Sequence, residues 1–235
     1  APTDKPLTLP DIDVRLADTR VMLATEMGAF TADVAGSGRL SGGFKGQVRA
    51  IAPYAGRDGC RLEAPVALAQ VSISRRRPQL IGSLMAAPST CGATRAGPVK
   101  ARFDVTLSEA LETWKGRATV TTSGVRQGLL EIAQATARID FTGNAAATRG
   151  TFALASPASR YAGTRLAGLS AKGDFGTGKS TTVASRLNVV RVLADPPQIA
   201  ALRRALGRAT GTPVGPLATV LSQAIGRAGD GASVD

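Results

Sequence analysis

The chain has 235 residues, a length that suits one large all-β domain or two small ones. Its 29 basic and 17 acidic residues give a formal net charge of +12, but it has only six Phe, two Tyr and one Trp. Because nucleic-acid bases stack on aromatic side chains, this scarcity of aromatic residues argues against a nucleic-acid partner. The sequence contains no His, the commonest general base and metal ligand, so the composition points away from an enzyme, a metal site or a cofactor.

Apolar residues at every second position predict β-strands with one apolar and one polar face, and this alternation starts near the N-terminus. After a polar lead-in at 1–10, the segments Val14–Leu16 and Val21–Leu23 predict a first hairpin. Alternation continues at 30–34 and again at 44–50. The glycines within these segments, from a total of 27 in the chain, predict a strongly curved or twisted sheet.

Three consecutive arginines, Arg75–Arg77, separate short predicted strands at 66–73 and 80–84. We interpret this run as a solvated turn; contact with a phosphate or lipid headgroup, or with nucleic acid, is the alternative. The clearest alternation of the chain then runs from Trp114 to Ser156. A long meander with few residues of catalytic type predicts a large, one-sided apolar surface rather than an active site.

The C-terminal part changes character after a last predicted strand pair at 166–175 and 181–193. Apolar residues there follow helical spacing, with Pro in the first turn; they are Ile199, Leu202 and Leu206, then Leu217, Val220, Leu221 and Ile225. The predicted fold class is therefore mainly β. A long twisted antiparallel β-meander spans 1–194, a pair of amphipathic helices spans 195–228, and a flexible end spans 229–235.

The segment Gly173–Ser180, GDFGTGKS, matches the phosphate-loop pattern G-x-x-x-x-G-K-[ST]. That pattern binds nucleotide phosphates only between a buried parallel strand and a helix, where Lys179 would contact the phosphates and Ser180 a magnesium ion. In the segments on both sides of it, apolar and polar residues alternate, whereas a buried parallel strand is continuously apolar. Too little chain follows the motif to form an α/β nucleotide-binding core. We therefore interpret the segment as a Gly-rich turn between antiparallel strands, with the phosphate loop as the alternative.

Four segments resemble the AsmA-like superfamily of bacterial envelope proteins, and most closely its YdbH branch. They are GSGRLSGGFKGQVRAIAP at 36–53, WKGRATVTTSGVRQG at 114–128, IDFTGNAAATRGTFALA at 139–155 and GTPVGPLATVLSQAIGRA at 211–228. The resemblance implies a periplasmic bridge anchored in the inner membrane, without catalytic residues. Its twisted sheet would fold into an open, taco-like groove that carries phospholipid acyl chains between the inner and outer membranes, with membrane proteins as partners at either end.

The alternation by itself also suits such a groove, because a groove leaves apolar strand faces accessible whereas a β-sandwich buries them against a second sheet. A closed-core structural or interaction domain of the envelope, such as an assembly or adhesin module, is the alternative. The candidate lining residues are Val14, Leu16, Val21, Leu23, Phe30, Val34, Phe44, Val48, Phe103, Val105, Val120, Ile139, Phe141, Phe152 and Leu154.

Cys60 and Cys91 lie near predicted loops and are either two reduced thiols or a disulfide. Their positions at strand ends and the extracytoplasmic interpretation favour a disulfide. The chain begins at Ala1 and contains no apolar run of about 18 residues, so no transmembrane helix is predicted. We interpret it as a segment of a longer polypeptide or as a processed chain.

Overall fold

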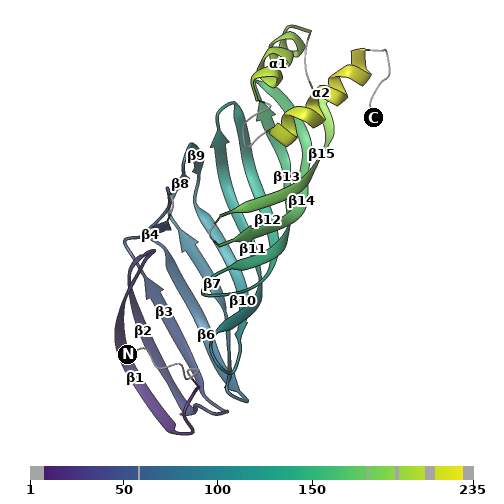
Figure 1. Cartoon of the computed structure of the whole chain (residues 1–235). Coiled ribbons are helices and arrows are strands. Elements are labelled where there is room, and N and C mark those ends of the chain that lie inside the picture. The colour runs from purple at the N-terminus through teal and green to yellow at the C-terminus, as the bar shows by residue number, and fades with distance from the viewer. Residues whose placement is uncertain (1–7, 58, 179, 194–195, 210–214, 230–235) are drawn as a thin grey trace.

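The computed structural model describes residues 8–57, 59–178, 180–193, 196–209 and 215–229, which form a long curved sheet with two helices at one end (Figure 1). The strands are β1 (Asp13–Thr25), β2 (Gly28–Arg39), β3 (Lys45–Ile51), β4 (Tyr54–Arg57), β5 (Cys60–Glu63), β6 (Val66–Ser74), β7 (Arg77–Ala86), β8 (Ser89–Cys91), β9 (Thr94–Ala96), β10 (Val99–Leu107), β11 (Thr113–Gln127), β12 (Leu130–Asn144), β13 (Thr148–Tyr161), β14 (Thr164–Thr177) and β15 (Thr182–Leu193). The helices are α1 (Pro196–Ala209) and α2 (Gly215–Gly229).

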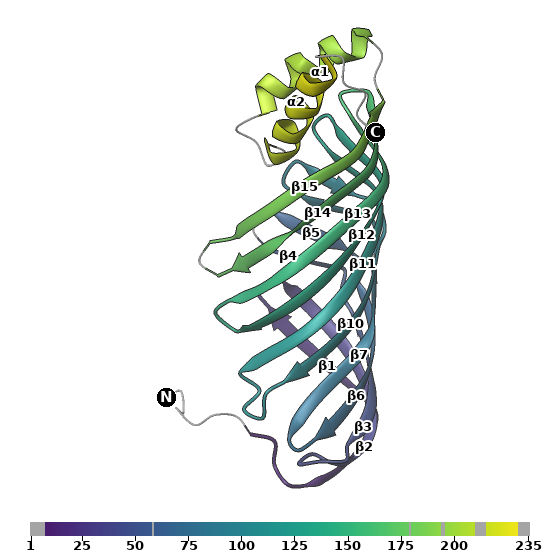
Figure 2. The same ribbon diagram turned by 90° about the vertical axis from the view of Figure 1, so that its right-hand side faces the viewer.

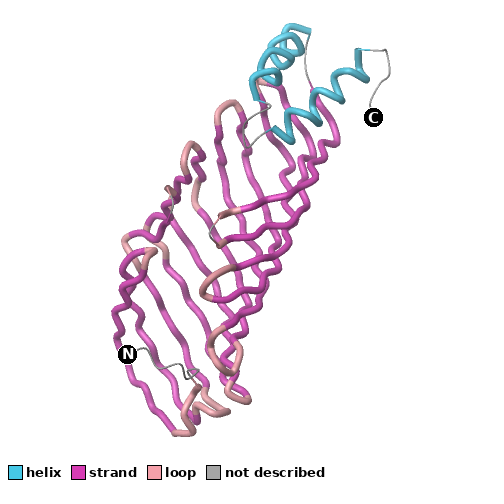
Figure 3. The backbone as a smooth tube through the Cα atoms, viewed as in Figure 1, coloured by secondary structure: helices cyan, strands magenta, loops and turns pink. Residues whose placement is uncertain are grey.

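All fifteen strands belong to one antiparallel, open sheet, so the predicted fold class is confirmed. The main path is β1-β2-β3-β6-β7-β10-β11-β12-β13-β14-β15, in which each strand pairs with the next along the path (Figure 3). The helices follow the last strand, close to the boundary predicted at residue 194. The predicted flexible end falls almost entirely at 230–235, and residues 194–195 and 210–214 likewise lie outside the described part of the chain.

The prediction of a first hairpin between Val14–Leu16 and Val21–Leu23 is wrong, because both segments belong to β1. The register against β2 shifts by one residue between Leu16 and Thr19, where Asp18 adopts a positive φ of 49°. This β-bulge interrupts the alternation in the sequence, which made one strand resemble two. The true hairpin joins Thr25 to Gly28.

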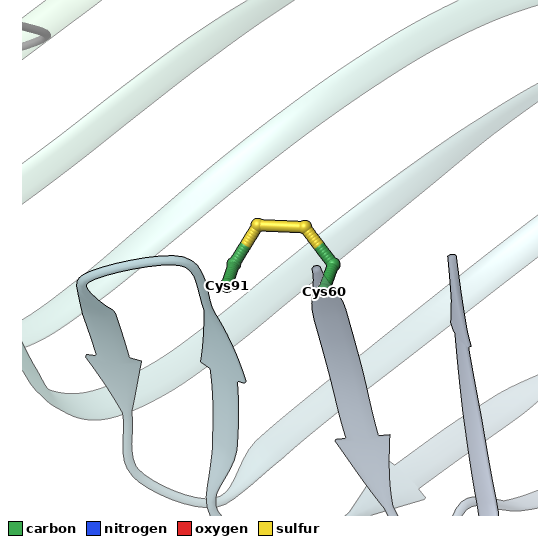
Figure 4. Close-up of a disulfide and its surroundings, with 2 residues drawn as sticks. All are labelled: Cys60 and Cys91. Carbon is green, nitrogen blue, oxygen red and sulfur yellow. A yellow bond between two sulfur atoms is a disulfide. The ribbon is translucent and has the colours of Figure 1, made fainter. Parts of the chain in front are cut away.

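Four short strands form a strip along the rim of the sheet, outside its main path. β4 pairs with β5, β5 with β8, β8 with β9, and β9 reaches β11 through the pair Arg126–Arg95. At its other end the Gly56 N–H donates to the Met27 carbonyl oxygen beside β2. Cys60 and Cys91 are paired across β5 and β8 and form a disulfide in the middle of this strip (Figure 4).

Strands β11 to β15 share an interruption of their alternation, which we call the phase-shift line. In each strand two consecutive residues point outward where alternation allows one; the pairs are Ser123–Gly124, Ala133–Gln134, Pro157–Ala158, Ala167–Gly168 and Val190–Arg191. Gly124 and Gly168 adopt φ of 69° and 66°, a conformation that favours glycine, and Pro157 has no N–H to donate. Because neighbouring strands shift together, the register is unchanged across the line.

The helices pack on the sheet beyond the phase-shift line and form the hydrophobic core with it. Leu217 and Leu221 of α2 and Leu166 of β14 are at most 2% exposed, and Ile132 and Leu206 lie in the same cluster. Figure 2 shows both helices on the inner side of the arch made by the last strands. The side chains of Ile199 and Leu202, which set the predicted helical spacing, lie outside the described residues.

Candidate functional site

The register of the sheet gathers the apolar residues of all main-path strands on one surface, which we call the apolar face. A row here is the line of directly paired residues that runs across the sheet, with one residue from each main-path strand. Three neighbouring rows run from β1 to β15 and start at Leu16, Thr19 and Val21. Together these rows contain no charged residue, although charged residues make up 20% of the chain. The row on the opposite surface that starts at Arg20 has seven charged residues among eleven. We call that surface the polar face.

Every candidate lining residue from the sequence lies on the apolar face or at its margin. Val21 and Leu23 of the edge strand are 38% and 51% exposed. Twelve others are half-buried: Val14, Leu16, Phe30, Val34, Val48, Phe103, Val105, Val120, Ile139, Phe141, Phe152 and Leu154. Phe44 differs, since it lies in the turn before β3 and is only 5% exposed. The structure adds Val71, Leu80, Leu84, Phe175 and Leu187, which alternation within their own strands could have identified.

Phenylalanine rings of the apolar face lie over glycines of the neighbouring strand. A Cβ atom added to Gly116 would come within 2.9 Å of Phe141 Cζ, and one added to Gly150 within 2.8 Å of Phe175 Cε1. Phe103 covers Gly82 in the same way. The glycines therefore leave space for flat-lying rings, which keeps the apolar face shallow and smooth. In the sequence these glycines predicted only a curved or twisted sheet, because the residue that lies opposite each glycine depends on the register between strands.

We expect Gly116→Ala to lower the free energy of unfolding by about 2 kcal/mol, the usual cost of overpacking. The added methyl group would lie 2.7 Å from the Asp104 carbonyl oxygen as well as against the Phe141 ring. Gly207→Ala is the matched control, because Gly207 lies in α1 with nothing within 4 Å of an added Cβ, and we expect it to stabilise by up to about 1 kcal/mol. Urea denaturation measures both changes, and an equal effect at the two positions would contradict the ring-over-glycine packing.

The polar face is a solvated surface with dispersed ion pairs. Arg20 Nε donates to Asp33 Oδ1 at 2.7 Å, and this hydrogen bond lowers the pKa of Asp33 and raises the pKa of Arg20. Arg117 pairs with Asp104 at 3.2 Å. Such exposed pairs contribute little to stability. A hollow of about 670 Å³ on this face lies beside Arg49 and Leu68.

Two sequence motifs are placed in turns. Gly173–Thr177 ends β14 and is followed by the antiparallel strand β15, so the segment GDFGTGKS belongs to a hairpin, as predicted, and not to a strand–helix connection; Lys179 lies outside the described residues. Arg75 and Arg76 form the two-residue turn between β6 and β7, with φ of 50° and 58°. Arg76 pairs with Glu109 at 3.3 Å, so the arginine run forms an exposed turn.

The helix pair covers one end of the apolar face, and in the part of the chain that the structure describes no other element covers the remaining strands. Tyr161, at the end of β13, is only 2% exposed beneath the helices, and this burial raises the pKa of its phenol, while Arg208 acts in the opposite direction. In contrast, Val183 at the other end of β15 is 63% exposed. The arrangement offers an apolar surface that is closed at one end and accessible along the remaining strands.

Comparison with known proteins assigns the chain to no family. No family model matches it, and neither a curated protein nor a solved structure does. Within the described ranges, neither helix is long and apolar enough to cross a membrane.

Proposed function

We propose that the apolar face binds the acyl chains of phospholipids, as one non-enzymatic segment of a periplasmic bridge that carries lipid between the inner and outer membranes. The observation that supports this proposal is an uncharged surface that runs across eleven strands and that the described residues cover only at one end. A sandwich of two sheets would bury such a surface as its core. Here most of its side chains stay half-buried within the described chain.

The apolar face is better suited to bind acyl chains than to bind a polar ligand. Burial of each methylene contributes about 0.8 kcal/mol, so a hydrocarbon chain gains affinity from contact area alone. The three central rows offer mainly aliphatic and aromatic side chains, and the flat rings of Phe103 and Phe141 leave a surface along which a flexible chain can lie. The resemblance to AsmA-like proteins, described above, supports the same substrate class and the periplasmic location.

The open edges support a place within a longer sheet. Within the described residues, β1 and β15 each pair with one strand only, so the backbone groups along their free edges are available for further pairing. Long unprotected edges invite pairing with other strands. We propose that the sheet continues into the remainder of a longer polypeptide or into partner proteins of the bridge.

Native mass spectrometry of the purified chain, with lipid extraction alongside, tests the proposal. We expect bound phospholipid that is lost in the double variant Phe141→Asp and Phe152→Asp, because two charges on the apolar face would have to be desolvated by the bound lipid. The matched control is Thr142→Asp with Thr151→Asp, which adds the same charges at adjacent positions on the polar face and should keep the lipid. Circular dichroism checks that both variants remain folded.

An alternative occupant of the apolar face is another protein, in which case the chain is an interaction module of the envelope. A clean protein mass without lipid, together with no uptake of a fluorescent phospholipid, would overturn the lipid proposal and favour that alternative. Loss of lipid in both double variants would show binding that does not depend on the apolar face, which also contradicts the proposal.

A further inference from the structure

A row of arginines crosses the polar face at the helix-bearing end of the sheet. Successive partners in the row are Arg95 of β9, Arg126 of β11, Glu131 of β12, Arg160 of β13 and Arg165 of β14. All five are exposed, and they lie on the side of the sheet opposite the buried helix contacts. The row combines four positive charges with a single negative one.

The charges of this row are poorly compensated. Glu131 pairs with Arg126 at 3.7 Å, but among the described residues Arg95, Arg160 and Arg165 form no ion pair. Arg160 faces Arg165 directly across β13 and β14, and Arg126 faces Arg95. Like charges directly opposite one another on a sheet are destabilising, so this row stands out from the neighbouring ion pairs of the polar face.

The arginines form one wall of a hollow that the phase-shift line creates. Its volume is about 450 Å³. Arg126, Arg160 and Arg165 line it together with Glu131, which pairs with Arg126, and with the small residues Ala133 and Ala158. Where two consecutive residues point outward, the small side chains of Ala133 and Ala158 leave space beside the arginines. The volume lies in the range of small-molecule sites.

We propose that this hollow binds a phosphate group. Guanidinium groups present paired N–H donors that match phosphate oxygens, and several of them around one hollow favour a group with more than one negative charge. A bound phosphate would also neutralise the repulsion between Arg160 and Arg165. The phosphate belongs either to a lipid headgroup or to a free anion. The site is on the face opposite the proposed acyl-chain surface, so it does not depend on that function.

The test compares the intact chain with the double variant Arg160→Gln and Arg165→Gln. The matched control is Arg102→Gln with Arg138→Gln, which removes the same charge from another row of the polar face. Two arms distinguish the sources: thermal unfolding with added pyrophosphate, and flotation with phosphatidylcholine vesicles that contain or lack phosphatidylglycerol. We expect Arg160→Gln with Arg165→Gln to weaken the binding of pyrophosphate or of the vesicles about tenfold, because a charge-assisted hydrogen bond is lost. The control variant should bind both probes about as well as the intact chain.

Loss of the pyrophosphate-induced rise in the unfolding temperature would assign the site to a free anion. Loss of phosphatidylglycerol-dependent flotation alone would assign it to a headgroup. The site variant alone should also unfold at a temperature equal to or higher than that of the intact chain in low salt without phosphate, because a repulsive pair is removed. Equal weakening by both double variants, or no binding in either arm, would overturn the proposal.

Discussion

Replacing Leu221 by Ala is expected to lower the free energy of unfolding by about 4 kcal/mol, because this side chain of α2 is completely buried between the helices and the sheet. The cost combines the lost transfer of the isobutyl group from water with the cavity left behind. Neighbours such as Leu166 belong to strands held by hydrogen bonds on both sides, so the site can collapse only partly. Urea denaturation followed by far-UV circular dichroism measures the change.

Leu68→Ala provides the matched control for this prediction. Leu68 carries the same side chain on the polar face, is 44% exposed, and should change stability by about 0.5 kcal/mol or less. A comparable loss at the two positions would mean that the helices do not form the core with the sheet. The prediction would also fail if Leu221→Ala left the urea midpoint unchanged.

Removal of the disulfide is expected to cost about 3 kcal/mol. The bridge joins residues 31 positions apart, and its loss releases the corresponding loop entropy in the unfolded chain. The double variant Cys60→Ser and Cys91→Ser should therefore show a lower urea midpoint than the intact chain under oxidising conditions. Because the bridge lies in the strip that joins the β2 region to β11, hydrogen exchange should accelerate first at β5 and β8.

Reduction of the intact chain gives an independent check on the same bridge. A reductant should lower the stability of the intact chain to that of the double variant and leave the double variant unchanged. If the reductant lowers the stability of the intact chain and of the double variant equally, the change has a cause other than the disulfide. If neither substitution nor reduction has an effect, the strip does not depend on the disulfide.

Alternation in the sequence was sufficient to identify the apolar face and most strands of the main path, but not the short strands of the rim, several of which lie in segments predicted as loops. In β12 and β13, Ile139, Phe141, Phe152 and Leu154 fall at every second position, and a period of two places them on one surface whichever strands are their neighbours. The GDFGTGKS segment was placed in a turn for the same reason, since the residues on both sides of it alternate. The helix pair was predicted from the change to a helical period after Pro196.

Features that depend on neighbouring strands could not be predicted in this way. The bulge at Asp18 made β1 resemble two strands, and the phase-shift line reversed the local alternation at Gly124 and Gly168. In both cases the sequence pattern breaks while the strand continues, because hydrogen bonds to the adjacent strands hold it in place. The position of a Phe ring over a glycine likewise depends on register, which no single strand contains.

Side-chain alternation is a local property of each strand, so it was enough to predict a β-meander with one apolar face. Three features appear only in the fold: the described residues leave most of this face uncovered, the helices cover one end of it, and Arg126, Arg160 and Arg165 line one hollow. Those features arise from curvature and from contacts between residues far apart in the chain. A period of two specifies which side a residue faces, but not what lies opposite that side.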